Sequence, residues 1–129
     1  MVDLQIWDTS GQDMYKNLTS IYYRDAHAAV MVFDYTNPTS LDNLKFWLAE
    51  LDDRVNTNDI IIKIVGNKHD LIDECERKVD IDDVRAALSD FDTTKFEFFK
   101  TSAITGENIA NLFSSIAEDC FKRYENRQL

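Results

Sequence analysis

The sequence predicts an α/β fold, in which an open, mostly parallel sheet lies between layers of helices. Apolar runs alternate with stretches of helical periodicity along the whole chain, which is the pattern of successive strand and helix units. Two of the runs, Ala28 to Tyr35 and Ile60 to Val65, are apolar nearly throughout, as expected of strands buried on both faces in mid-sheet. The 129 residues, 44% of them apolar, contain no linker or low-complexity segment, so we expect one domain over residues 1–129.

Four strands are predicted, and the first helix follows the second strand. The strands are expected at Val2 to Trp7, Ala28 to Tyr35, Ile60 to Val65 and Phe96 to Lys100. Apolar residues recur at helical spacing over residues 41–55 and predict a helix that packs on the sheet. Pro38 and the pair formed by Thr39 and Asp42 supply its start signal, the pair as a capping box.

Two further helices are predicted in the second half of the chain. The apolar spacing indicates a short helix over residues 81–91 and a long final helix over residues 109–124. Thr105 is the expected N-cap of the final helix. The long irregular stretch of the chain is expected from Asn67 to Val79.

The charge of the chain argues against several classes of ligand. A net charge of -10 disfavours nucleic acid and anionic membrane, which both attract positive proteins. No apolar run is long enough for a membrane span, and Asp3 and Asp8 replace the basic start of a secretion signal, so we expect a cytoplasmic location. Cys75 and Cys120 offer neither a CxxC pair nor metal-ligand spacing, which indicates free thiols rather than a zinc site.

The first of three short motifs follows the first predicted strand. Residues 7–12, with the sequence WDTSGQ, read as a strand end followed by a tight loop. This arrangement places the carboxylate of Asp8 and a backbone N–H where a metal ion and a terminal phosphate could meet. The alternative interpretation is a turn in which Asp8, Thr9 and Ser10 bond the backbone before Gly11.

The other two motifs follow later strands. Residues 67–70, with the sequence NKHD, come after an apolar strand, and a carboxylate there can accept two parallel hydrogen bonds from the edge of guanine, which adenine cannot donate. Residues 101–103, with the sequence TSA, precede the final helix and can point backbone N–H groups into the crevice at the carboxyl ends of the strands. The alternatives are a polar turn for the first and helix capping for the second.

Taken together and in this order, the three motifs resemble those of the small GTPases. Within that superfamily the stretch over residues 15–55 resembles the Rab proteins, especially at residues 22–26 (YYRDA) and 32–36 (VFDYT). The resemblance covers essentially the entire chain. It implies the small-GTPase sheet, here N-terminally truncated, and a GTP-binding and GTP-hydrolysing switch in intracellular vesicle trafficking.

The resemblance also implies roles for residues of the first motif. Asp8 would hold a water on the Mg²⁺ ion, and the Gly11 N–H would bond the terminal phosphate. Gln12 would be the catalytic residue that orients the attacking water. Trp7, Tyr15 and Tyr22 match the surface through which Rab proteins meet their protein effectors and regulators.

The remaining motifs would read the base of GTP or GDP. Asn67 and Asp70 would recognise guanine, and Lys68 would lie along the base and ribose. The backbone at Ser102 and Ala103 would contact the guanine oxygen, with Ile104 next to them in place of a lysine usual in the family. His69 is assigned no role.

The sequence departs from the family in several places. Ser10 replaces a usual alanine and Asp13 a usual glutamate. More importantly, no phosphate-binding loop of the form G-x-x-x-x-G-K-[ST] occurs in these residues, and residues 123–129 lack the cysteines that would be prenylated, so no membrane anchor is expected in this form. We therefore expect this chain by itself neither to bind nor to hydrolyse GTP efficiently. The alternative function is a nucleotide-independent Rab-like interaction module.

The resemblance also predicts a problem for the sheet. In the family, a strand that precedes the phosphate loop lies between the strands matching Val2 to Trp7 and Ala28 to Tyr35. Three solutions remain open at this point: the flanking strands close together, a partner or swapped dimer donates a strand, or the polypeptide is longer.

Overall fold

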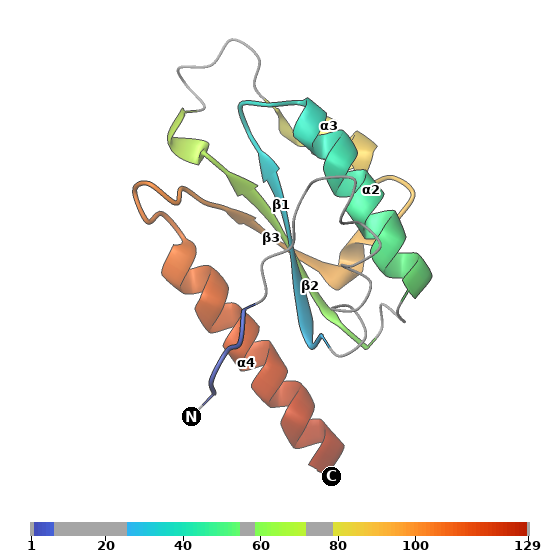
Figure 1. Cartoon of the computed structure of the whole chain (residues 1–129), viewed down its shortest axis with the longest axis vertical. Coiled ribbons are helices and arrows are strands. Elements are labelled where there is room, and N and C mark those ends of the chain that lie inside the picture. Colours follow the sequence, from blue (N-terminus) through green and yellow to red (C-terminus); the bar gives the residue numbers. More distant parts are fainter. Residues whose placement is uncertain (1, 7–25, 55–58, 72–78, 129) are drawn as a thin grey trace.

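A computed structural model of the chain describes residues 2–6, 26–54, 59–71 and 79–128. This part forms a parallel sheet with helices on both faces, which confirms the predicted α/β class (Figure 1). In chain order the elements are β1 (Ala28–Asp34), α2 (Thr39–Arg54), β2 (Ile61–Asn67), η2 (His69–Leu71), α3 (Ile81–Ala87), η3 (Thr93–Lys95), β3 (Phe96–Lys100) and α4 (Ile109–Gln128); η2 and η3 are short 3-10 helices.

Strand β2 is the centre of the described sheet. The strand order is β1-β2-β3, and both pairings are parallel. The register aligns Asp34 with Asn67 and Gly66 with Lys100, so the three strands end at the same edge. Residues 61–66 are all buried, as predicted for a central strand of a parallel sheet.

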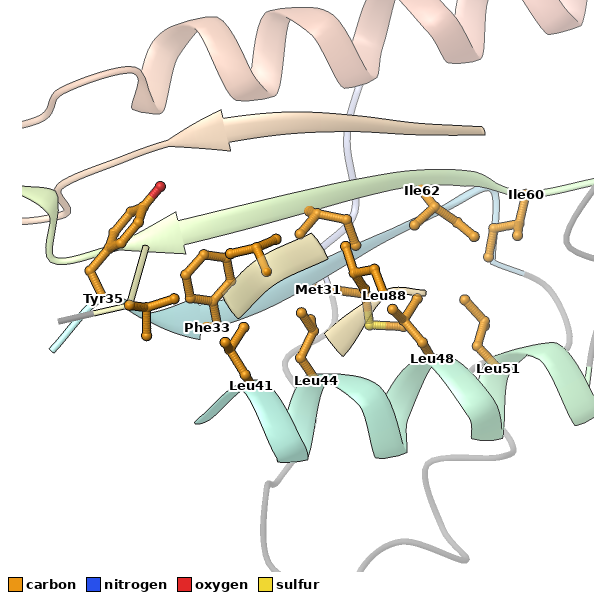
Figure 2. Close-up of a cluster of buried hydrophobic side chains, with 13 residues drawn as sticks. Met31, Phe33, Tyr35, Leu41, Leu44, Leu48, Leu51, Ile60, Ile62 and Leu88 are labelled. Carbon is orange, nitrogen blue, oxygen red and sulfur yellow. The ribbon is translucent and has the colours of Figure 1, made fainter. Parts of the chain in front are cut away.

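One face of the sheet is covered by α2 and α3. The apolar residues of α2 recur every three or four positions, which places them on one side of the helix, and Figure 2 shows this side turned toward β1 and β2. Full burial of one such leucine contributes about 1.5–3 kcal/mol. The buried residues of this core are Met31, Phe33, Tyr35, Leu41, Leu44, Leu48, Leu51, Ile60, Ile62, Ile64, Val79, Val84 and Leu88.

The opposite face is covered by α4. Leu112 and Ile116 pack with Val65 in a second, smaller apolar cluster, which Cys120 borders. One helical turn beyond Ile116, α4 meets the buried Lys63 of β2 through a polar contact. None of the helices in the described ranges is long and apolar enough to cross a membrane.

The helix starts differ from the predicted ones. Thr39 is already the first helical residue of α2, and its N–H is bonded by the Asn37 side chain at 3.1 Å, so Asn37 takes the capping role predicted for Thr39. The prediction of Thr105 as the N-cap of the final helix is also wrong, because α4 begins at Ile109 and the Leu112 N–H bonds the carbonyl of Asn108. Thr105 Oγ1 instead accepts a hydrogen bond from the Glu107 N–H at 3.2 Å, in the turn before the helix.

Helix α3 carries a capping box that sequence analysis did not identify. Asp80 accepts a hydrogen bond from the Asp83 N–H at 2.9 Å, and the Asp83 side chain accepts one from the Asp80 N–H at 3.0 Å. Two backbone N–H groups at the start of the helix, which have no partner within the helix, thereby gain an acceptor. The acidic run at this point of the chain therefore stabilises a helix start.

The predicted first strand is not formed. Residues 2–6 adopt no strand, and Trp7 lies outside the described residues. In the described part of the chain only β2 pairs with β1, so β1 is an edge strand and the prediction that it lies in mid-sheet is wrong. Val30 and Val32 of β1 are 39% and 56% exposed, because α4 packs over β2 and leaves this part of the face uncovered. The closure of the flanking strands that sequence analysis considered is thus absent here.

Gly66 in β2 is required by close packing. A Cβ atom at this position would lie 2.6 Å from Cζ of Tyr35 and 2.7 Å from Cζ of Phe33. These two rings pack edge to face, with centroids 5.0 Å apart, at the end of β1. Because both belong to the packed core, neither ring can move away freely.

We predict that Gly66→Ala lowers the free energy of unfolding by about 1–3 kcal/mol, the usual range for overpacking. Urea unfolding followed by circular dichroism measures the change. A second variant, Tyr35→Leu, should reduce the effect of the added methyl group when the two are combined, because it removes the nearest ring. Full additivity of the two changes would contradict this explanation.

Candidate functional site

Polar residues gather where the three strands end. Asp34 and Asn67 are the last residues of β1 and β2, and Thr101 follows directly after β3. The parallel register brings these positions to one edge of the sheet. In open α/β sheets, this edge is where ligands bind. The motifs at residues 67–70 and 101–103 are therefore brought together, as predicted from the sequence.

Asn67 ties the two motifs to each other. Its Oδ1 accepts hydrogen bonds from Thr101 Oγ1 and from the Ala103 N–H, both at 3.1 Å. The Thr101 N–H also bonds the carbonyl of Gly66 at 2.8 Å, and Thr101 is buried. The side chain of Asn67 thus holds the backbone of residues 101–103 in a fixed position against the end of β2.

Asp70 is oriented by Ser102. The fully buried Ser102 donates from Oγ to Asp70 Oδ1 at 2.8 Å and accepts from the Thr105 N–H at 3.1 Å. Within the described part of the chain, the second carboxylate oxygen of Asp70 has no hydrogen-bond partner. It is available to a ligand that offers N–H donors. Ile104 beside it is 83% exposed.

Lys68 is paired with Asp34. The two side chains form an ion pair of 2.8 Å, and Lys68 occupies the left-handed region at φ 61. Burial alone would raise the pKa of Asp34, but hydrogen bonds from Lys68 and Thr36 outweigh burial and hold that pKa below its ordinary value. The Asp34 carboxylate in turn raises the pKa of Lys68. A positive charge therefore stands at this edge of the sheet.

His69, Tyr35 and Glu107 form a contact that sequence analysis missed. Nδ1 of His69 lies 3.0 Å from Glu107 Oε1, and the rings of His69 and Tyr35 have centroids 5.4 Å apart. Burial, followed by the charge of Glu107, raises the pKa of Tyr35 to about 12. His69 is thus a structural link between η2 and the loop before α4. No sequence signal could have identified it, because Glu107 is distant in the chain.

The site can hold a planar, hydrogen-bonding ligand at its described half. A free carboxylate oxygen, the exposed backbone of Ala103 and an ammonium group lie together on elements fixed by internal hydrogen bonds. The other residues assigned from the sequence cannot be placed in this geometry. They lie outside the described residues, and they are Trp7, Asp8, Gly11, Gln12, Tyr15 and Tyr22.

Comparison with known proteins identifies relatives over nearly the whole chain. The model of the Ras family matches residues 1–122. A putative ras-related protein Rab-5B of Dictyostelium discoideum is 40% identical over 124 residues, which cover 96% of this chain and 55% of that protein. The GTP-binding protein ypt5 of Schizosaccharomyces pombe is 43% identical over 117 residues, which cover 91% of this chain and 53% of that protein. Ras-related protein Rab-26 of Bos taurus is 37% identical over 123 residues, which cover 95% of this chain and 46% of that protein. The chain spans about half the length of these relatives.

We predict that Asn67→Ala lowers the free energy of unfolding by about 1–3 kcal/mol, because the Ala103 N–H and the buried Thr101 hydroxyl each lose an acceptor. Asn67→Asp retains an acceptor oxygen and should lower the free energy of unfolding by a smaller amount. Urea unfolding gives the stabilities, and amide hydrogen exchange at Ala103 reports the local loss. Equal stability of Asn67→Ala and the parent chain would show that this tether is unimportant.

A second prediction concerns pH. Because the pKa of Asp34 is lower in the folded chain than its value of about 3.9 in an unfolded one, its ionised form stabilises the fold above that pH. This contribution is lost as the pH falls through the folded-state pKa. Asp34→Asn should therefore destabilise the chain near neutral pH, and the difference from the parent should shrink in acid.

Urea unfolding of both chains across this pH range tests the prediction. Lys68→Met provides the matched variant, since it removes the cation that lowers the pKa of Asp34. When Lys68→Met is combined with Asp34→Asn, it should lower the free energy of unfolding little further, because the ion pair is already broken. A difference between parent and Asp34→Asn that stays constant into acid would refute the role of ionisation.

Proposed function

The chain belongs to the Ras family as a Rab-type small GTPase, and on this premise we propose that it serves a GTP-dependent switch in vesicle trafficking. The proposal is supported by the Rab and ypt names of its relatives and by the assembly of the two base-reading motifs at one edge of the sheet. Its partners would be effector and regulator proteins of the Rab type.

The observation that carries this proposal is the available oxygen of Asp70. Guanine presents two N–H donors side by side, and a carboxylate held in place by Ser102 can accept from both. Adenine lacks these donors and would leave the carboxylate unpaired, which disfavours it. The N–H groups of Ser102 and Ala103 donate here to the Glu107 carbonyl and to Asn67 Oδ1, and they would share or exchange these bonds to meet the guanine oxygen.

Lys68 would change its partner when nucleotide binds. In the present geometry its ammonium group is bonded to Asp34. We propose that it turns to lie along the base and ribose, with Ile104 at the open side of the site. Since Lys68 and Asp34 are both partly exposed, with side-chain exposures of 50% and 23%, the exchange does not require opening of the core.

The proposed contacts to the phosphates of the nucleotide come from the motif at residues 7–12. Asp8 would hold a water on Mg²⁺, the Gly11 N–H would bond the terminal phosphate, and Gln12 would orient the attacking water. These 129 residues contain no G-x-x-x-x-G-K-[ST] loop. Hydrogen bonds to the base contribute about 1.5–3 kcal/mol each, whereas association costs about 4–15 kcal/mol. We therefore propose that residues 1–129 alone bind GTP and GDP weakly and hydrolyse GTP inefficiently.

A second candidate function is a nucleotide-independent interaction module of the Rab type. It is favoured by one observation: the loops at residues 67–70 and 101–103 are held to each other by hydrogen bonds within the chain. In this case Trp7, Tyr15 and Tyr22 would provide the surface for protein partners. A well-folded chain that binds such partners equally with and without nucleotide would support this function.

We predict that GDP with Mg²⁺ binds residues 1–129 weakly but in preference to ADP, and that Asp70→Asn reverses the preference toward xanthosine diphosphate. Xanthine carries an oxygen where guanine carries its amino group, so an asparagine amide can pair with it. Titrations followed by amide chemical shifts at Asn67 and Ala103 measure the affinities, with a change of about tenfold or more expected for loss of a charge-assisted pair.

The matched control is Asp90→Asn, which alters an exposed carboxylate paired only with Lys45 in the described part of the chain. It should leave GDP binding unchanged. Equal shifts with GDP and ADP, or an Asp70→Asn chain that still prefers GDP, would overturn the assignment of guanine recognition. Tight GDP binding that requires Asp70 would keep that assignment and overturn only the proposal of weak binding.

A further inference from the structure

A cavity of about 390 Å³ lies at the amino ends of β2 and β3, beside the last turns of α4. We propose that this cavity is a binding site for a small organic anion, a compound with one phosphate or carboxylate group on an apolar body. It is separate from the sheet edge where the three strands end and where we propose that guanine binds. Ile61, which lines it, and Asn67 are six positions apart on one strand, or roughly 20 Å.

The lining residues come from three segments. Strand β2 supplies Ile61 to Lys63, η3 and β3 supply Thr94 to Glu97, and α4 supplies its C-terminal half. The full set is Ile61, Ile62, Lys63, Thr94, Lys95, Phe96, Glu97, Asp119, Lys122 and Arg123. The C-terminal half of α4 passes the amino ends of the strands (Figure 1), and its residues Asp119, Lys122 and Arg123 line one side of the cavity.

Two carboxylates in the wall share one buried ammonium group, which balances one of their two negative charges. Lys63 is 2% exposed and donates to Glu97 and to Asp119, and it bonds Ser115 Oγ at 3.1 Å. Burial alone would lower the pKa of Lys63, but the hydrogen bonds and charges of Asp119 and Glu97 raise it above its ordinary value. The lysine is therefore charged, and the two carboxylates are oriented toward it.

The remaining charges of the cavity are positive. Lys95, Lys122 and Arg123 form no direct ion pair in the described part of the chain, although Asp92 lies close enough to Lys95 to interact with its charge. Four cations thus line a cavity with two carboxylates, on a chain whose net charge is -10. A concentration of positive charge against this background attracts anions to one place on the surface.

The size and composition of the cavity indicate the class of ligand. A volume of about 390 Å³ lies in the range of small-molecule sites, and Ile61 and Phe96 supply apolar lining beside the cations. Lys122 and Arg123 of α4 both line the cavity, and ammonium and guanidinium groups are donors suited to a phosphate or carboxylate group. An apolar body beside the strands with its anionic group toward α4 satisfies both sets of residues.

The test uses the whole 129-residue chain, labelled with ¹⁵N, and phenyl phosphate as the probe. Amide chemical shifts of Ile61, Phe96 and Lys122 should change and saturate, while those of Asn67 and Ala103 should not. Inorganic phosphate, which lacks the apolar body, should bind the same amides more weakly, and neutral benzyl alcohol more weakly still. Sodium benzoate replaces phosphate by carboxylate and shows which anionic group is preferred.

The double variant Lys122→Ala/Arg123→Ala should weaken phenyl phosphate binding about tenfold or more, since it removes two charge-assisted donors. Lys45→Ala, which removes a lysine of α2 paired with Asp90, is the matched control and should bind as the parent does. Circular dichroism verifies folding, and Lys95→Ala is the second variant if the double one unfolds.

Three results would overturn the proposal. These are shift changes that do not saturate, changes confined to the amides of residues 67–70 and 101–103, and equal affinity of the parent chain and the cation variants. Guanine recognition is judged separately, by the comparison of GDP with ADP and by Asp70→Asn, so none of these results by itself decides it. The two proposals can therefore fail independently.

Discussion

The structure depends on the double pairing of β2. This strand is hydrogen bonded to β1 on one side and to β3 on the other, in parallel, and its residues from Ile61 to Gly66 are buried. Parallel pairing requires a crossover segment between strands, and the two crossovers carry α2 and α3 on the same face, whereas α4 follows β3 and covers the other face. It also makes the three strands end level, which is why residues far apart in sequence meet around Asn67.

The two faces of β2 are stabilised differently. The face toward α2 and α3 is a closely packed apolar core, where even Gly66 cannot accept a methyl group without moving an aromatic ring. The face toward α4 combines a small apolar cluster with the buried Lys63. A buried charge is costly when it loses a partner, and Glu97 and Asp119 therefore fix α4 against the sheet at a defined position. The same ion network contributes charged groups to the cavity at the amino ends of the strands.

The sheet edge where residues 67–70 and 101–103 meet is held in place by side-chain hydrogen bonds. Asn67 and Ser102 use their hydrogen bonds to hold the loop and the carboxylate of Asp70. The exposed side-chain contact between His69 and Glu107 also joins these two segments. Preorganisation of this kind lowers the ordering cost of binding.

Local patterns in the sequence determined the α/β class, the strands at Ala28–Asp34 and Phe96–Lys100, and the motifs at the strand ends. These features follow from side-chain periodicity and from short-range turn chemistry, which act between neighbours in the chain. Tertiary structure alone decided that residues 2–6 form no strand, that Val32 is exposed on an edge strand, and that Lys63 is buried between two carboxylates. The physical reason is that strand pairing and burial of charge depend on which distant segments supply the partners, and periodicity carries no information about them.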